Sequence, residues 1–145
     1  MDPTLGAVLG VSMRWIHIAS VVTLVGGFIY ARFVLAPALA TLPAAEGELA
    51  GSRTVSAFRP LLIAVVITTL GSGLYNYATK ASYPPGYHMW MGIKLLLVLH
   101  IYASSILYAV RDSNQAKRNR TALSVAISGF IVIGIADYLR YLSSK

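Results

Sequence analysis

The sequence contains no cysteine and few charged residues. The absence of cysteine excludes disulfides, thiolate metal sites and cysteine-ligated iron–sulfur clusters, so any bound metal must use histidine, methionine or carboxylate side chains. Only 12% of the 145 residues are charged, about half the fraction usual in soluble domains, whereas 57% are hydrophobic. The absence of cysteine and of acidic clusters argues against a dedicated metal pump. This composition indicates that lipid, rather than water, surrounds most of the chain.

The hydrophobic residues are gathered in four runs. Each run approaches or exceeds the roughly 17 to 25 residues that cross a bilayer core. Because backbone amides in lipid need internal partners, and because no strand-like alternation is present, these runs must be helices. We therefore predict an all-α integral membrane four-helix bundle that forms one domain, with spans over about 11–39, 60–79, 88–110 and 121–142. Pro60 suits the first turn of the second helix, and we expect 41–54 to be a solvated surface loop or short helix.

The excess of Lys and Arg, a net charge of +7, follows the loops rather than forming a nucleic-acid-binding patch. The loop after the third span is the most basic, the loop after the first span carries two arginines, and the loop between the second and third spans has one lysine. Basic loops stay in the cytoplasm. We therefore predict a multi-pass protein of the cell membrane with both termini outside. The residues that carry this bias are Arg53, Arg59, Lys80, Arg111, Lys117, Arg118 and Arg120.

Four ionisable side chains lie inside the predicted spans, namely His17, Lys94, His100 and Asp137. Such groups are costly in a bilayer and usually face the bundle interior, so each is a functional candidate. At 1.5 Å per residue, the first, second and fourth lie about 6 to 10 Å from the middle of their spans toward the outside. His100 lies roughly 12 Å from His17 along the membrane normal, in a different layer.

Histidine provides two candidate metal ligands, His17 and His100. A neutral imidazole can supply an axial nitrogen to haem iron, and glycines in a helical bundle leave room for a flat macrocycle. The alternative for His17 is a histidine that is satisfied by a neighbouring carbonyl or serine. The alternative for His100 is a role in helix packing. His88 beside Met89 is either an interfacial residue or a copper-binding pair.

Lys94 and Asp137 are candidates for catalytic roles. One interpretation pairs them as ions at similar depth. Another has Lys94 hold an anionic group such as a porphyrin propionate, or take part in proton transfer. Tyrosines gather at the outer boundary as an aromatic belt, and one of them could bind a quinone or porphyrin edge.

Two segments resemble a known family. The run from Trp15 to Gly27, WIHIASVVTLVGG, resembles the opening helix of HemJ-type and copper-resistance D membrane proteins, in which a histidine precedes a pair of small residues. The run from Met91 to Val98, MGIKLLLV, is similar to the start of HemJ's third helix. The resemblance implies a haem-b-containing protoporphyrinogen IX oxidase with His17 as haem ligand and Lys94 as a site residue. Leu24 stands where that family has a tryptophan.

Three functions therefore remain as hypotheses. The first is a haem b-binding membrane oxidoreductase that acts on a porphyrin-like or quinone-like apolar substrate taken from the bilayer. The second is a copper-resistance D-like protein that binds or transports copper. The third is a structural subunit whose polar residues lock the helices together. Four spans are too few for a typical alternating-access transporter unless the chain forms a homo-oligomer.

Overall fold

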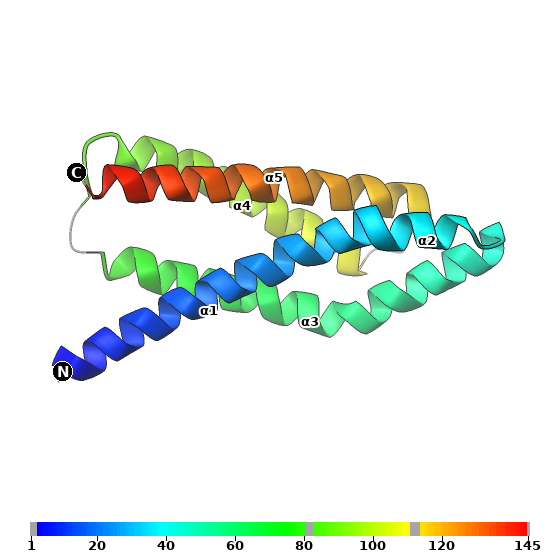
Figure 1. Cartoon of the computed structure of the whole chain (residues 1–145), viewed down its shortest axis with the longest axis horizontal. Coiled ribbons are helices and arrows are strands. Elements are labelled where there is room, and N and C mark those ends of the chain that lie inside the picture. Colours follow the sequence, from blue (N-terminus) through cyan, green and yellow to red (C-terminus); the bar gives the residue numbers. More distant parts are fainter. Residues whose placement is uncertain (1–2, 81–82, 111–113, 145) are drawn as a thin grey trace.

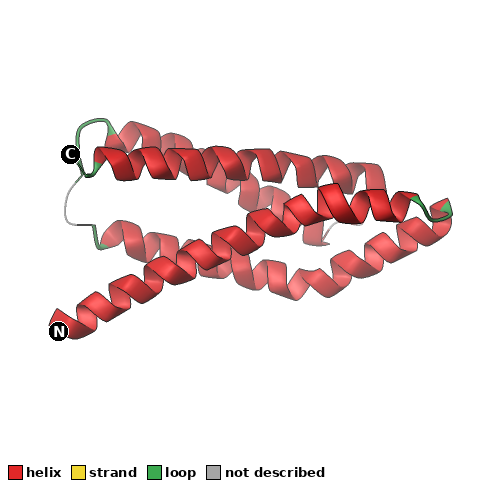
Figure 2. Cartoon of the chain, in the orientation of Figure 1, coloured by secondary structure: helices red, strands yellow, loops and turns green. Residues whose placement is uncertain are grey.

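The computed structural model describes residues 3–80, 83–110 and 114–144, and this part of the chain contains helices and short connections but no strand (Figure 2). The first long helix begins as α1 (Pro3–Tyr30), passes through a π-helical stretch, η1 (Ala31–Leu35), and ends as α2 (Ala36–Ala40). Three further helices follow, α3 (Ala44–Ala78), α4 (Tyr87–Val110) and α5 (Gln115–Leu142). The prediction of an all-α four-helix bundle is confirmed.

The helices run alternately up and down (Figure 1). Helix α1 packs on α3 and α5, and α4 packs on α3 and α5. The ends of the chain and the α3–α4 connection lie at one end of the bundle, which we call the terminal end. The α2–α3 and α4–α5 connections lie at the other end, which we call the basic end because it carries most of the arginines.

The outside of the bundle is apolar. All four helices are long and hydrophobic enough to cross a membrane, and only 22–39% of each span's most apolar window is buried inside the protein. Large side chains such as Trp15, Ile67 and Leu96 are at least 65% exposed. In water this surface would be a severe aggregation liability, whereas in a bilayer the acyl chains cover it. The chain is thus a multi-pass membrane protein.

Packing between the helices depends on two hydrophobic clusters, a larger one around Phe28 and a smaller one around Tyr87, Ile135 and Leu139, and on close backbone approach. Phe28, Leu62 and Val125 are almost completely buried, and the Phe28 ring meets Tyr108 edge to face at 5.2 Å. At Gly129, an added Cβ would lie only 2.6 Å from Val25 Cγ2, so α5 approaches α1 more closely than any other residue would allow. This use of glycine is common where membrane helices must gain stability from packing rather than from the hydrophobic effect.

Three helix ends differ from the predicted ones. Helix α3 begins at Ala44, so Pro60 lies in its interior instead of its first turn, and that prediction is wrong. The extension is stable because it packs on the basic end: an added Cβ at Gly47 would lie 2.9 Å from the Leu39 carbonyl oxygen. Helix α1 begins at Pro3, before the predicted position 11. Helix α5 begins at Gln115 because the Asn114 side chain caps it by accepting a hydrogen bond from the Lys117 amide.

The π-helical stretch η1 has a cause in the sequence. Pro37 has no backbone N–H and its ring collides with the carbonyl four residues earlier, so the regular ladder cannot continue through it. The ladder widens just before it, and the Ala36 N–H donates to the Ala31 carbonyl, five residues back. The helix therefore continues to Ala40 without a break.

Candidate functional site

His17 lies on the face of α1 that packs against α3. Its Nδ1 is 3.1 Å from the backbone carbonyl of Thr69 and 3.1 Å from the Ser72 hydroxyl. Both partners are buried, and the imidazole itself is half-buried. The prediction that a carbonyl or a serine could satisfy His17 is thus confirmed for one ring nitrogen. The other nitrogen, Nε2, has no partner among the described residues.

The hydrogen bonds around Ser72 fix which nitrogen carries the proton. A carbonyl oxygen such as that of Thr69 can only accept. The single hydroxyl hydrogen of Ser72 is directed to the main chain of α3, because its Oγ lies 2.6 Å from the Thr68 oxygen and 3.3 Å from the Thr69 oxygen. Toward His17 the serine must therefore accept as well. Nδ1 carries the hydrogen and Nε2 carries the free lone pair, which is the arrangement usual in metal-ligating histidines.

The imidazole rests directly on a glycine of α3. An added Cβ at Gly73 would lie 3.0 Å from Cε1 and 3.4 Å from Nδ1 of His17. Only a residue without a side chain lets the ring sit flat enough to reach its two acceptors. Gly71, two residues earlier, has open space around it instead. Gly73 therefore positions the imidazole, and Gly71 does not.

Lys94 lies on α4 and is half-buried. Its ammonium is close enough to interact electrostatically with the His17 imidazole, although the two side chains come from different helices. No hydrogen bond or ion pair to Lys94 is formed within the described residues. Of the four predicted site residues, His17 and Lys94 thus influence each other electrostatically without a direct contact, and no carboxylate of the described residues pairs with Lys94.

Asp137 and His100 do not join this pair. Asp137 is exposed on α5, two residues from buried Ile135 and from buried Leu139, so it faces away from the interior. The ion pair between Asp137 and Lys94 is not formed, and that interpretation is wrong. His100 is exposed too, and its Nε2 lies 3.0 Å from the Ser124 hydroxyl on α5, which agrees with a packing role between these two helices.

His88 lies in an aromatic cluster at the terminal end. Its ring contacts those of Tyr83 and Tyr87, with centroids 5.3 and 6.2 Å apart. The Nζ of Lys80 lies 3.9 Å from the centroid of the Tyr87 ring. Partial loss of contact with water lowers the pKa of the Lys80 ammonium. Among the residues that the structure describes, no three His, Asp or Glu side chains gather as a metal site would require.

A polar cluster at the basic end was not among the predicted sites. Arg118 is only 5% exposed, and its Nη2 lies 2.6 Å from Glu48 Oε2. The other carboxylate oxygen of Glu48 accepts a hydrogen bond of 2.8 Å from the backbone amide of Gln115, at the first turn of α5. Gly51 makes room for the cluster, since its Cβ would lie 2.9 Å from Arg118 Nη2. The cluster ties the extension of α3 to the start of α5, and Arg118 is therefore more than a topology signal.

Comparison with known proteins gives no relative for this chain. No protein-family model, curated protein or solved structure matches it.

Proposed function

We propose that this protein is a haem b-binding membrane oxidoreductase in which Nε2 of His17 is an axial ligand of the haem iron. The observation that carries the proposal is the hydrogen bonding of the imidazole. Because Nδ1 donates to the Thr69 carbonyl and to Ser72, the lone pair of Nε2 is free to coordinate.

The donor set fits haem better than it fits a dedicated protein-only metal site. A structural or catalytic zinc or copper centre needs about three protein ligands, and the described residues offer no such group. Haem iron receives four nitrogens from the porphyrin and asks the protein for one or two axial ligands. A single well-oriented histidine meets that demand. When bound, haem b supplies one-electron redox chemistry within the bilayer.

Lys94 supports the same proposal because, within the described residues, no carboxylate pairs with its half-buried ammonium. A buried ammonium is stable only near an anion or a strong dipole. The carboxylates of a porphyrin would supply that anion, and the lysine would then fix the orientation of the macrocycle. The HemJ-like resemblance adds the specific reaction, oxidation of an apolar porphyrinogen that enters from the membrane.

Asp137 and His100 have no part in the proposed site. Both side chains are exposed, and neither contacts His17 or Lys94. Among the described histidines, His17 alone would therefore hold the haem.

The absorption spectrum of the purified protein tests the proposal. Protein from haem-sufficient cells should show a Soret band and the reduced α band of b-type haem. His17→Ala should lose most of this haem while its circular dichroism remains helical. His100→Ala and His88→Ala are matched controls, because they remove the only other histidines, and both should keep the spectrum. Full haem content in His17→Ala would refute the assignment.

Lys94→Met tests the orientation of the haem separately from the ligation of its iron. It keeps the length of the side chain and removes the charge, so we expect haem to remain and its reduction potential to shift. Loss of all haem in Lys94→Met, with normal haem in His17→Ala, would reverse the proposed roles.

A further inference from the structure

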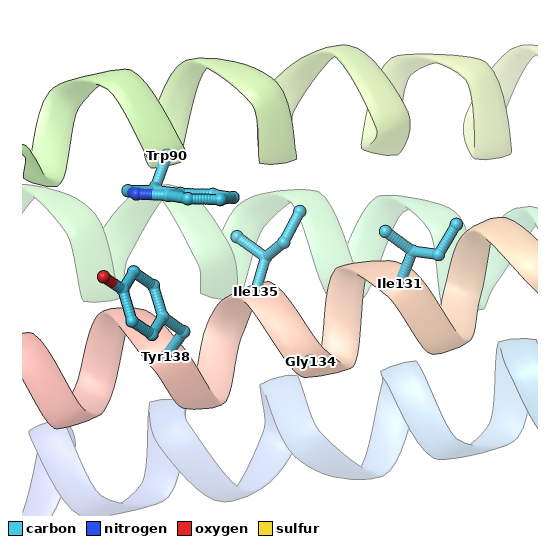
Figure 3. Close-up of a pocket in the computed structure, with 5 residues that line it drawn as sticks. All are labelled: Trp90, Ile131, Gly134, Ile135 and Tyr138. Carbon is cyan, nitrogen blue, oxygen red and sulfur yellow. The ribbon is translucent and has the colours of Figure 1, made fainter.

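A groove between α4 and α5 opens on the outside of the bundle near the terminal end. Its volume is about 310 Å³, and its lining is almost entirely apolar (Figure 3). Trp90 comes from α4, and the other four residues, Ile131, Gly134, Ile135 and Tyr138, come from α5. The groove exists because Gly134 has no side chain, and an added Cβ there would meet nothing within 4 Å.

Two aromatic rings form one end of the groove. The indole of Trp90 and the phenol of Tyr138 meet edge to face, with centroids 5.2 Å apart and planes at 68°. Figure 3 shows the indole nitrogen and the phenol oxygen at this same end, with Ile131 at the opposite end. Neither polar atom has a hydrogen-bond partner within the described residues.

The groove therefore has a polar end and an apolar body. The polar end lies toward the ends of the helices, because Trp90 is in the first turn of α4 and Tyr138 in the last turns of α5. At 1.5 Å per residue, Trp90 lies about 4.5 Å and Tyr138 about 6 Å from the end of its helix, and Trp and Tyr are the residues enriched where head groups meet acyl chains. The isoleucines lie deeper, where the surroundings are hydrocarbon.

We propose that this groove binds the ring of an isoprenoid quinone. A flat ring fits against aromatic and isoleucine side chains over the glycine, and its carbonyl oxygens would accept hydrogen bonds from the indole N–H and the phenol O–H. The tail would leave sideways into the lipid. A phospholipid chain has no ring to place against Trp90.

The biological role of this site rests on the proposed oxidoreductase function. An oxidase in the bilayer needs an acceptor that reaches it through lipid. In that role the quinone takes up two electrons and two protons from the oxidised substrate and leaves as the hydroquinone. Binding itself requires no haem, so it can be tested on its own.

The chain offers a direct optical probe, because it has only two tryptophans. Trp15 is 68% exposed on α1, far from the groove in sequence and facing lipid, so Trp15→Phe leaves Trp90 as the sole indole. The Trp15→Phe protein in detergent is titrated with decylubiquinone, and the fluorescence of Trp90 is recorded. A ring in contact with the indole should quench it with a saturable curve.

Two further variants are compared in the Trp15→Phe background. Gly134→Leu fills the groove and should abolish saturable quenching. Gly92→Leu adds the same side chain to an exposed glycine of α4 with open space around it, and should leave the curve unchanged. Tyr138→Phe removes one hydrogen bond, and we expect the half-saturating concentration to rise about 2- to 10-fold.

Three outcomes would overturn the proposal. Quenching that grows linearly with quinone and is the same in all variants would mean simple partitioning into the detergent. If adding decanol at concentrations similar to those of decylubiquinone restored the quenched Trp90 fluorescence, the groove would be an acyl-chain site. Dissociation of a dimer by Gly134→Leu without quinone would make it an interface between copies. A missing Soret band would refute only the haem proposal, because quenching of Trp90 does not depend on it.

Discussion

Replacing Gly129 by alanine should destabilise the bundle, although alanine is the better helix former. The added Cβ would lie 2.6 Å from Cγ2 and 3.1 Å from Cγ1 of Val25. Val25 is β-branched and buried, so it has few other rotamers to adopt. Overpacking costs about 1–3 kcal/mol, and such a short contact belongs in the upper part of that range. The gain of about 1 kcal/mol in helix propensity offsets part of it, which leaves a net loss of about 1–2 kcal/mol.

Unfolding of the purified protein in detergent, followed by circular dichroism, measures this loss. For a chain of this size we expect the Tm of Gly129→Ala to fall by roughly 3–8 °C. Gly134→Ala is the matched control on the same helix, because its Cβ would meet nothing within 4 Å, and it should be neutral or slightly stabilising. Combining Gly129→Ala with Val25→Ala should recover about 1–2 kcal/mol relative to the sum of the single changes. Equal Tm values for the two glycine variants would refute the close approach of α1 and α5.

Three other predictions follow from the polar contacts and from the charge pattern. Glu48→Gln should lower the Tm more than Glu46→Gln, because only the first removes the carboxylate that neutralises a buried arginine. Gly73→Ala should weaken haem retention by displacing the ligand imidazole, whereas Gly71→Ala should not. A reporter fused after Lys145 should be found outside the cytoplasm, and a cytoplasmic signal would contradict the topology drawn from the basic loops.

The four helices could be predicted from sequence because a bilayer imposes a length and a composition on whatever crosses it. Their ends could not be predicted as well, because helix outside the lipid carries no such signature. The extension of α3 from Ala44 depends on contacts with Leu39, Gln115 and Arg118, which are close only after folding. The capping residue Asn114 was a readable signal for the start of α5.

Depth along a helix could be estimated from sequence, but the direction of each side chain could not. Asp137 and Lys94 were placed at one level by counting residues, yet Asp137 is about 200° around α5 from the buried Ile135 and points outward. In a membrane helix both faces are apolar, so the sequence does not mark which one is buried. The pairing of His17 with Thr69 and Ser72 was hidden for the same reason.

The hydrogen bonds of His17 also connect its protonation to the position of a whole helix. Thr69 contributes a backbone oxygen, so no change of side chain at that position removes the acceptor. Separating them requires either displacement of the imidazole, as in Gly73→Ala, or a sliding or rotation of α3 against α1, and a slide of one turn would be about 5.4 Å. The hydrogen bond from Nδ1 to the Thr69 carbonyl therefore depends on the register of the two helices. Nitrogen NMR of the single imidazole that faces α3 would report that register directly.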